Sequence, residues 1–128
     1  MRVRGEPRHR IVVGIDGSDA SLHAVRWAVV QARLRMATVE LVHVGDEGEA
    51  SDALLAHAVE VVEAADVDEL DVTTAVVEGD TVARLVERAE RADLLVIAKG
   101  GVVCAAVVAA ARCPVVVVPP SRRADARG

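Results

Sequence analysis

The fold is decided by the stretch Arg10-Ile11-Val12-Val13-Gly14-Ile15-Asp16-Gly17-Ser18. Its apolar run ends in a polar, glycine-containing turn, which is typical of a buried strand and the turn at its carboxyl end. Either Ser18 or Asp19 can cap a following helix, and apolar residues recur at spacings of three and four over residues 19–35. The chain therefore begins with a buried strand that leads directly into a helix.

The same alternation continues to the end of the sequence. Further strands are predicted at 39–44, 71–77, 94–98 and 115–118, and further helices at 50–65, 81–91 and 102–112. Helical crossovers between strands imply a parallel sheet covered on both faces, and right-handed crossovers leave only doubly wound topologies. The 128 residues contain no internal repeat and no interdomain linker, so we expect one α/β domain.

Composition limits the classes of partner. The chain has 27 Val and 23 Ala but a single aromatic residue, Trp27, and small branched side chains suit buried parallel strands. One aromatic side chain excludes the base-stacking platforms of single-strand nucleic-acid modules. Residues 11–119 hold eighteen acidic and eight basic side chains, a charge of −10 that argues against a nucleic-acid-binding face.

The two ends of the chain are basic. Residues 1–10 and 120–128 together carry seven arginines and two acids, a charge of +5. We expect a structured domain over 9–119, with disordered, solvated tails at 1–8 and 120–128. Contact of these arginines with phosphate or an anionic lipid surface is the alternative interpretation.

The two cysteines, Cys104 and Cys113, are nine residues apart and lack the spacing of a disulfide framework or a zinc site. Reduced thiols are the default in the cytoplasm, where we expect this protein. No stretch reaches about 18 uninterrupted apolar residues, so no membrane span is predicted.

Ligands of open parallel sheets bind beyond the carboxyl ends of the strands, where the strand order reverses. The first strand usually lies beside that point, and here it ends in Gly14, Asp16 and Gly17. The glycines would let a ligand approach the backbone, and Asp16 could accept from a sugar hydroxyl or hold a cation. The same residues also suit an ordinary capped turn between strand and helix.

Six segments together resemble the universal stress protein family, over roughly residues 9–119. They are Ile11–Ser18, Ala24–Ala28, Leu41–Val44, Gly79-Asp80, Ala92–Ile97 and Cys113–Val118. The resemblance implies a Rossmann-like, adenine nucleotide alpha hydrolase-like sheet in the order 3-2-1-4-5, a dimer, and in many members an ATP or AMP site. Carried over by position, Gly14, Ile15 and Asp16 would line the adenosine, with Asp16 on the ribose. Val44 would meet adenine through its backbone, and Ile97 and Ala98 would lie against the nucleotide.

The phosphate loop departs from the family pattern, which resembles Gly, two residues, Gly, nine residues, then Gly-Ser or Gly-Thr. Here the fourth strand is followed by Ala98-Lys99-Gly100-Gly101-Val102-Val103-Cys104, so the nine-residue spacer and the final hydroxyl are missing. Residues 99–113 must supply a whole crossover, which needs about 10–12 residues at minimum. About five remain for both connections, too few to wrap a triphosphate. A helix N-terminus after Gly100-Gly101, with Lys99 beside it, could still hold one phosphate or another small anion.

We therefore expect a non-enzymatic, regulatory, universal stress protein-like protein that has lost tight ATP binding and has no tightly bound cofactor. The alternative is weak binding of AMP, or of ATP with Mg²⁺, through Gly14–Asp16 and Val44; a weak ATPase is a more distant alternative. No catalytic set and no metal-ligand spacing is found. Four consecutive valines on a predicted edge strand, Val115–Val118, favour a homodimer formed through that strand.

Overall fold

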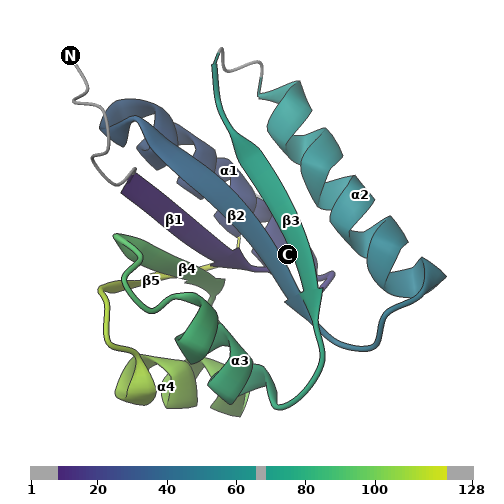
Figure 1. Cartoon of the computed structure of the whole chain (residues 1–128), viewed down its shortest axis with the longest axis vertical. Coiled ribbons are helices and arrows are strands. Elements are labelled where there is room, and N and C mark those ends of the chain that lie inside the picture. Colours follow the sequence, from purple (N-terminus) through teal and green to yellow (C-terminus); the bar gives the residue numbers. More distant parts are fainter. Residues whose placement is uncertain (1–8, 66–68, 121–128) are drawn as a thin grey trace.

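The computed structural model describes residues 9–65 and 69–120. Five strands alternate with four helices along the chain (Figure 1). In order they are β1 (His9–Gly14), α1 (Asp19–Arg35), β2 (Ala37–Val44), α2 (Glu49–Ala64), β3 (Val72–Val77), α3 (Thr81–Arg88), β4 (Leu94–Ala98), α4 (Gly101–Ala110) and β5 (Val115–Val118). The predicted sequence of elements is confirmed.

The strands form one parallel sheet in the order β3-β2-β1-β4-β5. The chain first winds outward from β1 through β2 to β3, and then returns to β4 on the other side of β1. This confirms the doubly wound prediction. The reversal of direction places the topological switch point between β1 and β4, where a ligand site is expected in such sheets.

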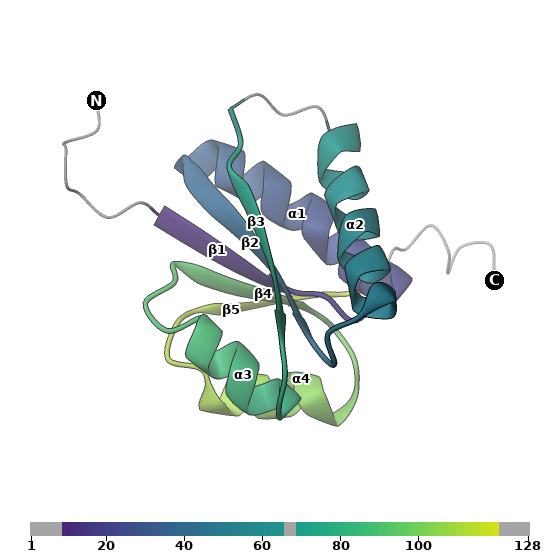
Figure 2. The ribbon, with the colours of Figure 1, turned by 45° about the vertical axis from the view of Figure 1, so that its right-hand side comes forward.

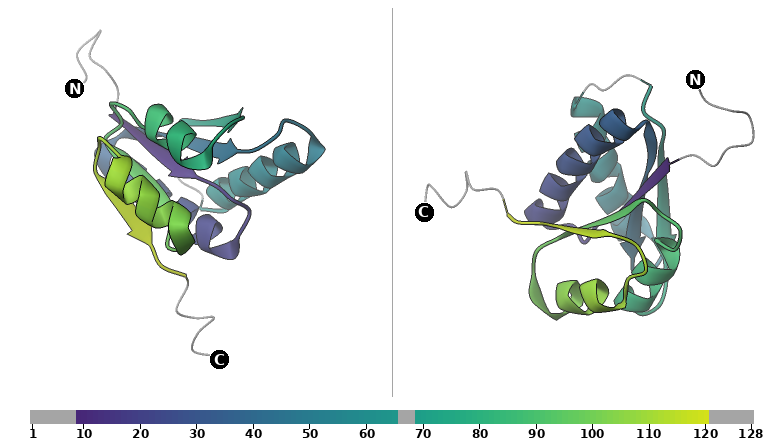
Figure 3. Two further views of the ribbon diagram at one scale, coloured as in Figure 1. Left: turned by 90° about the horizontal axis from the view of Figure 1, so that it is seen from below. Right: turned by 90° about the vertical axis from the view of Figure 1, so that its left-hand side faces the viewer.

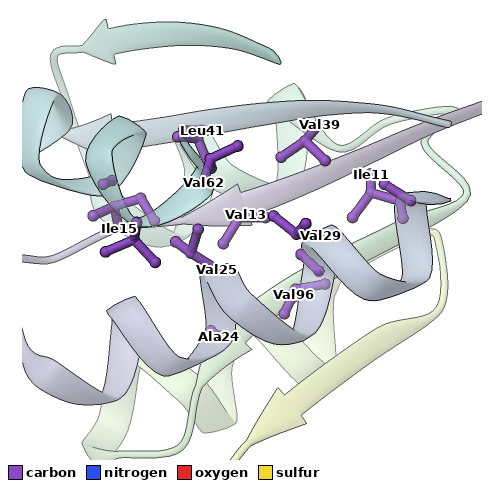
Figure 4. Packing of buried hydrophobic residues seen from close by; sticks show 14 of the residues in the cluster. Ile11, Val13, Ile15, Ala24, Val25, Val29, Val39, Leu41, Val62 and Val96 are labelled. Atoms are coloured by element: carbon purple, nitrogen blue, oxygen red, sulfur yellow. The ribbon is translucent and has the colours of Figure 1, made fainter. Parts of the chain in front are cut away.

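The helices cover the two faces of the sheet in pairs. Helices α1 and α2 pack together on one face and α3 and α4 on the other (Figures 1 and 2). On the first face, Ile11 and Val13 of β1 meet Val25 and Val29 of α1, and all four are fully buried (Figure 4). Because β1 is buried from both sides, its central residues are apolar without alternation, as in parallel sheets generally.

Helix α1 begins and ends as its sequence predicts. The Ser18 hydroxyl accepts a hydrogen bond from the Ser21 backbone N–H at 3.1 Å, which caps the N-terminus. At the other end, Met36 adopts a left-handed conformation with φ of 56° and closes the last turn through Ala32 and Arg33. Helix α3, in contrast, ends at Arg88, three residues before the predicted end at Arg91.

Arg10, counted above with the basic N-terminal residues 1–10, is not a solvated arginine. His9 and Arg10 belong to β1, and the Arg10 guanidinium donates to a Glu40 carboxylate oxygen at 2.8 Å and to the Arg88 carbonyl at 3.0 Å. His9 also lies 2.6 Å from the Asp93 carboxylate. Arg10 is therefore a structural cation that joins β1 to β2 and to the end of α3, and it is not part of a solvated tail.

The predicted tails at 1–8 and 120–128 lie outside the described residues, except for Pro120. Pro119 and Pro120 follow β5 and are exposed. Among the helices in the described part of the chain, none combines the length and the apolar character that a membrane crossing requires.

Candidate functional site

A cleft of about 410 Å³ opens at the carboxyl ends of β1, β2 and β4, beside the amino ends of α3 and α4. This is the switch point of the sheet, and the volume falls in the range of about 300–1,000 Å³ that is usual for small-molecule sites. The cleft is therefore the candidate site to which the sequence pointed.

The structure brings eight of the ten predicted site residues to the wall of this cleft. They are Gly14, Ile15, Asp16, Val44, Ile97, Ala98, Lys99 and Gly100. The other two, Gly101 and Val102, are the first two residues of α4 and stand between the lining residues Gly100 and Val103. All ten thus lie at one end of the sheet, although they come from three strands, one helix and the connections after β1 and β4.

Sequence reasoning left out seven further lining residues: Ser18, Val42, His43, Thr81, Leu85, Val103 and Cys104. The main omission is α3, which supplies Thr81 and Leu85 from its first two turns. A signal was available, because the connection after β3 must also reach the carboxyl edge of a parallel sheet. The buried Leu85 in the apolar face of this helix could have been placed against β1 on that ground.

Gly14 has a packing role as well as a place in the cleft. A Cβ built on Gly14 would lie 3.3 Å from the Leu85 side chain and 3.4 Å from that of Ile97. The missing side chain therefore lets α3 and β4 close over the end of β1. Gly100 differs, because a Cβ there would meet open space.

Asp16 is held in an ionised form by Ser18. The Ser18 hydroxyl and backbone N–H both donate to Asp16 Oδ1, at 2.6 and 2.9 Å. Burial alone would raise the pKa of Asp16, but these hydrogen bonds outweigh it, and the pKa lies below its ordinary value of 3.8. At neutral pH the cleft therefore presents a fixed carboxylate at the end of β1.

His43 fixes the adjoining turn. Its Nδ1 lies 2.7 Å from the Ile15 carbonyl oxygen, so Nδ1 carries the hydrogen and donates it. A Cβ on Gly45 would come within 2.7 Å of the other ring nitrogen, which shows how closely the ring lies against that glycine. His43 thus joins the end of β2 to the backbone just after β1.

The connection at the α4 end of the cleft, where the resemblance would place phosphates, is short. Only Lys99 and Gly100 connect β4 to α4, and the Lys99 backbone N–H donates to the Val118 carbonyl at 2.8 Å. Helix α4 has Gly100 as its N-cap with no side-chain hydrogen bond at that cap. The exposed Lys99, the one lysine in the sequence, stands beside this helix end.

Other chemistry-bearing groups are sparse in the described part of the chain. No three His, Cys, Asp or Glu side chains come together there in a way that could hold a metal ion. Burial raises the pKa of the Cys113 thiol, with Arg10 acting weakly in the opposite direction, so Cys113 is a protonated packing residue. Cys104 is half-buried in the wall of the cleft.

Comparison with known proteins gives a consistent result. The universal stress protein family matches residues 7–119. Universal stress proteins MT3220 and Rv3134c of Mycobacterium tuberculosis are each 32% identical over 135 residues, which cover 90% of this chain and 50% of those proteins. The chain thus spans about half the length of these curated relatives.

Solved structures are similar over nearly the whole fold. A universal stress protein in complex with cAMP has 30% identity and a TM-score of 0.80, covering 91% of this chain and all of that one. One from Archaeoglobus fulgidus in complex with dAMP has 24% identity and a TM-score of 0.76, over 86% of this chain and 97% of that one. One from Arabidopsis thaliana with AMP bound has 18% identity and a TM-score of 0.70, over 90% of this chain and 94% of that one.

Proposed function

This chain belongs to the universal stress protein family, and we propose that it is a non-enzymatic binding protein whose cleft takes an adenine mononucleotide weakly. In this proposal the second and third phosphates of ATP add nothing to its affinity for the cleft. The observation that carries it is the site itself, in which a cleft lined by the predicted adenosine residues ends in a connection of only two residues.

The nucleoside half of the ligand would lie on the ends of β1 and β2. The Asp16 carboxylate is ionised and held by Ser18, so it is oriented to accept from ribose hydroxyls. Val44 lines the same cleft, where its backbone could meet the edge of adenine. Complexes of similar proteins with cAMP, dAMP and AMP support this choice of ligand class.

The phosphate half would meet the amino end of α4 and Lys99. Such helix-end and charge contributions are each about 0.3–1 kcal/mol at exposed sites, far from the roughly 8 kcal/mol of a micromolar complex. The body of the chain also carries a charge of −10 over residues 11–119, which disfavours a polyphosphate more than a monophosphate. We expect dissociation constants of about 0.1–1 mM.

Calorimetry with AMP tests the adenosine contacts. Asp16→Ala removes a charged acceptor, and hydrogen bonds to charged groups contribute about 1.5–3 kcal/mol, so affinity should fall about tenfold or more. Asp46→Ala is the matched control, because Asp46 is an exposed acid in the connection after β2 and is absent from the cleft lining. AMP affinity that is unchanged in Asp16→Ala, with the fold intact by circular dichroism, would contradict the proposed site.

We also propose a homodimer through β5. This strand is at one edge of the sheet, and Figure 3 shows it at the border between the two helix pairs. Its four valines are buried or half-buried within one chain, and nothing charged protects the edge. Pairing of two copies about a two-fold axis would remove this edge. The free thiols of Cys104 and Cys113 favour a cytoplasmic location within the same proposal.

A further inference from the structure

The opposite edge of the sheet is β3, and its outer side has a distinct pattern. The carbonyls of Asp71 and Val77 accept hydrogen bonds from Val39 and Gly45 on the side of β2. Backbone groups alternate in direction along a strand, so odd-numbered residues of β3 face β2 and even-numbered residues face outward. The N–H and C=O groups of Thr74 and Val76 therefore point away from the sheet.

The six residues of β3 lack the charged and proline residues that usually protect an edge strand against pairing. Natural edge strands are commonly guarded by lysine, proline or a bulge, but β3 reads Val-Thr-Thr-Ala-Val-Val without a charge or a proline. Its pairing with β2 is regular over all six residues, from Val72 to Val77. The strand is thus a regular template for a further strand.

A groove of about 570 Å³ runs beside this edge. One wall is formed by Thr74, Ala75 and Val76 of β3, and the other by Leu55, Ala56 and Val59 of α2. Figure 1 shows α2 beside β3 at this side of the molecule. A strand added to β3 would therefore rest its side chains on a small apolar surface of α2.

The end of the groove is acidic. Exposed Glu47 and Asp52 line it, and none of the described lining residues is basic. An extended segment in this groove would meet apolar surface along α2 and two carboxylates where α2 begins. Basic side chains alternating with small apolar ones fit that arrangement, because successive residues of a strand point to opposite faces.

We propose that the groove between α2 and β3 binds an extended segment of another protein in which arginine alternates with small apolar residues. The segment pairs with the outward backbone groups of Thr74 and Val76 as a sixth strand. Its arginines reach Glu47 and Asp52. A second copy of β3 is a poorer occupant, because it would bring two acidic rims together.

Amide hydrogen exchange by NMR tests strand addition directly. The probe is the acetylated, amidated peptide Arg-Val-Arg-Val-Arg, added to the full chain at about 0.15 M salt, where the Debye length is about 8 Å. Exchange at Thr74 and Val76 should slow at least tenfold at saturation. Thr73 and Ala75, which already face β2, serve as internal controls and should change little.

Two double variants test the charge contacts by titration with the same peptide. Glu47→Gln with Asp52→Asn should weaken binding about tenfold, since two charge pairs with the arginines of the peptide are lost. Glu60→Gln with Glu63→Gln makes the same charge change at exposed sites of α2 outside the groove lining, and should stay within about twofold of the unmodified protein.

Three results would overturn the proposal. One is slowing of amide exchange that does not alternate between even- and odd-numbered residues of β3, or no slowing of exchange at all. Another is protection of Thr74 and Val76 in the free protein that rises with protein concentration, which would identify a second copy as the occupant. The last is protection of Thr74 and Val76 that disappears when residues 1–8 or 121–128 are removed. This result would identify the chain's own arginine-bearing ends as the occupant of the groove.

Discussion

Two glycines at the cleft show how differently one residue type can act. At Gly14 the missing side chain admits Leu85 and Ile97, whereas at Gly100 the corresponding space is open. Gly100 has a φ of 162°, an extended value that any residue adopts, so its backbone does not require glycine. The first glycine is part of the packing, and the second borders open space in the wall of the cleft.

Gly14→Ala should lower the free energy of unfolding by about 1–3 kcal/mol, because the new methyl group is forced against two packed side chains. Gly100→Ala should change it by less than about 0.5 kcal/mol. Urea unfolding of the two variants measures this directly. Equal destabilisation by both would contradict the packing role assigned to Gly14.

Ser18→Ala should have two effects. Loss of the cap on α1 should lower the free energy of unfolding, measured in urea, by about 1 kcal/mol. Loss of the hydroxyl donor should raise the pKa of Asp16 toward its ordinary value, which a carboxyl NMR titration can follow. Ser51→Ala is the control, since its hydroxyl donates to the Asp46 carbonyl and should leave Asp16 unaffected.

The sign of the pH effect follows from the lowered pKa of Asp16. A carboxyl group whose pKa is lower in the folded state stabilises the protein above the unfolded pKa, and this contribution is lost as the pH falls through the folded value. The contribution is therefore complete above about pH 4 and lost below it. The Ser18→Ala variant should lose less stability than the unmodified protein as the pH falls through that window. An equal loss in the two proteins would contradict the role of Ser18 in lowering the pKa of Asp16.

Most site residues could be predicted because they follow strands whose apolar runs are plain in the sequence. Asp16, Val44 and Ala98 each come at or just after the end of a strand, so the topology alone brings them together. Thr81 and Leu85 were missed because the apolar face of α3 was not traced back to the carboxyl edge of the sheet, which the connection after β3 has to reach.

At the scale of elements, one buried carboxylate ties three of them together. Glu40 of β2 is 9% exposed and binds Arg10 of β1 at 2.8 Å and Arg88 of α3 at 2.8 Å. Arg10 also donates to the Glu90 carbonyl at 2.9 Å, so it caps the end of α3 as well. This network holds the carboxyl end of α3 against the sheet, while the amino end of the same helix lines the cleft.

Glu40→Gln should destabilise the protein by about 1–3 kcal/mol, because two guanidinium groups lose the charge they share. Glu60→Gln, at an exposed position of α2, should change the stability by less than about 0.5 kcal/mol. Denaturant unfolding compares the two. A Glu40→Gln variant as stable as the control would show that the network contributes little.

Elements were predicted well because hydrophobic periodicity is local, whereas the ends of elements depend on contacts between distant residues. Arg10 looked like one more charge of a basic tail, since its partner Glu40 is 30 residues away. Helix α3 was predicted to continue to Arg91, but Ala92 donates to the Ala89 carbonyl in a turn that already leads into β4.

At the scale of the whole molecule, the two edges of the sheet are assigned to different partners. The carbonyls of Pro114 and Val118 accept hydrogen bonds from backbone N–H groups on the side of β4. Because backbone groups alternate in direction along a strand, those of Val117 face outward from β5. Val117→Pro removes an outward N–H and leaves the pairing with β4 in place, as edge prolines do.

Light scattering at micromolar concentration should therefore give a dimer for the unmodified chain and a monomer for Val117→Pro. Val76→Pro makes the same change on the outer side of β3 and should remain a dimer. A monomer mass for the unmodified protein, or a dimer that survives Val117→Pro, would contradict dimerisation through β5.

The most direct measurement compares AMP with ATP and Mg²⁺ by isothermal titration calorimetry, at one ionic strength and one protein concentration. If the connection from Ala98 to Gly101 cannot enclose a polyphosphate, the two dissociation constants should agree within about threefold, a difference of about 0.7 kcal/mol. A constant for ATP with Mg²⁺ that is micromolar and at least tenfold lower than that for AMP would contradict this account.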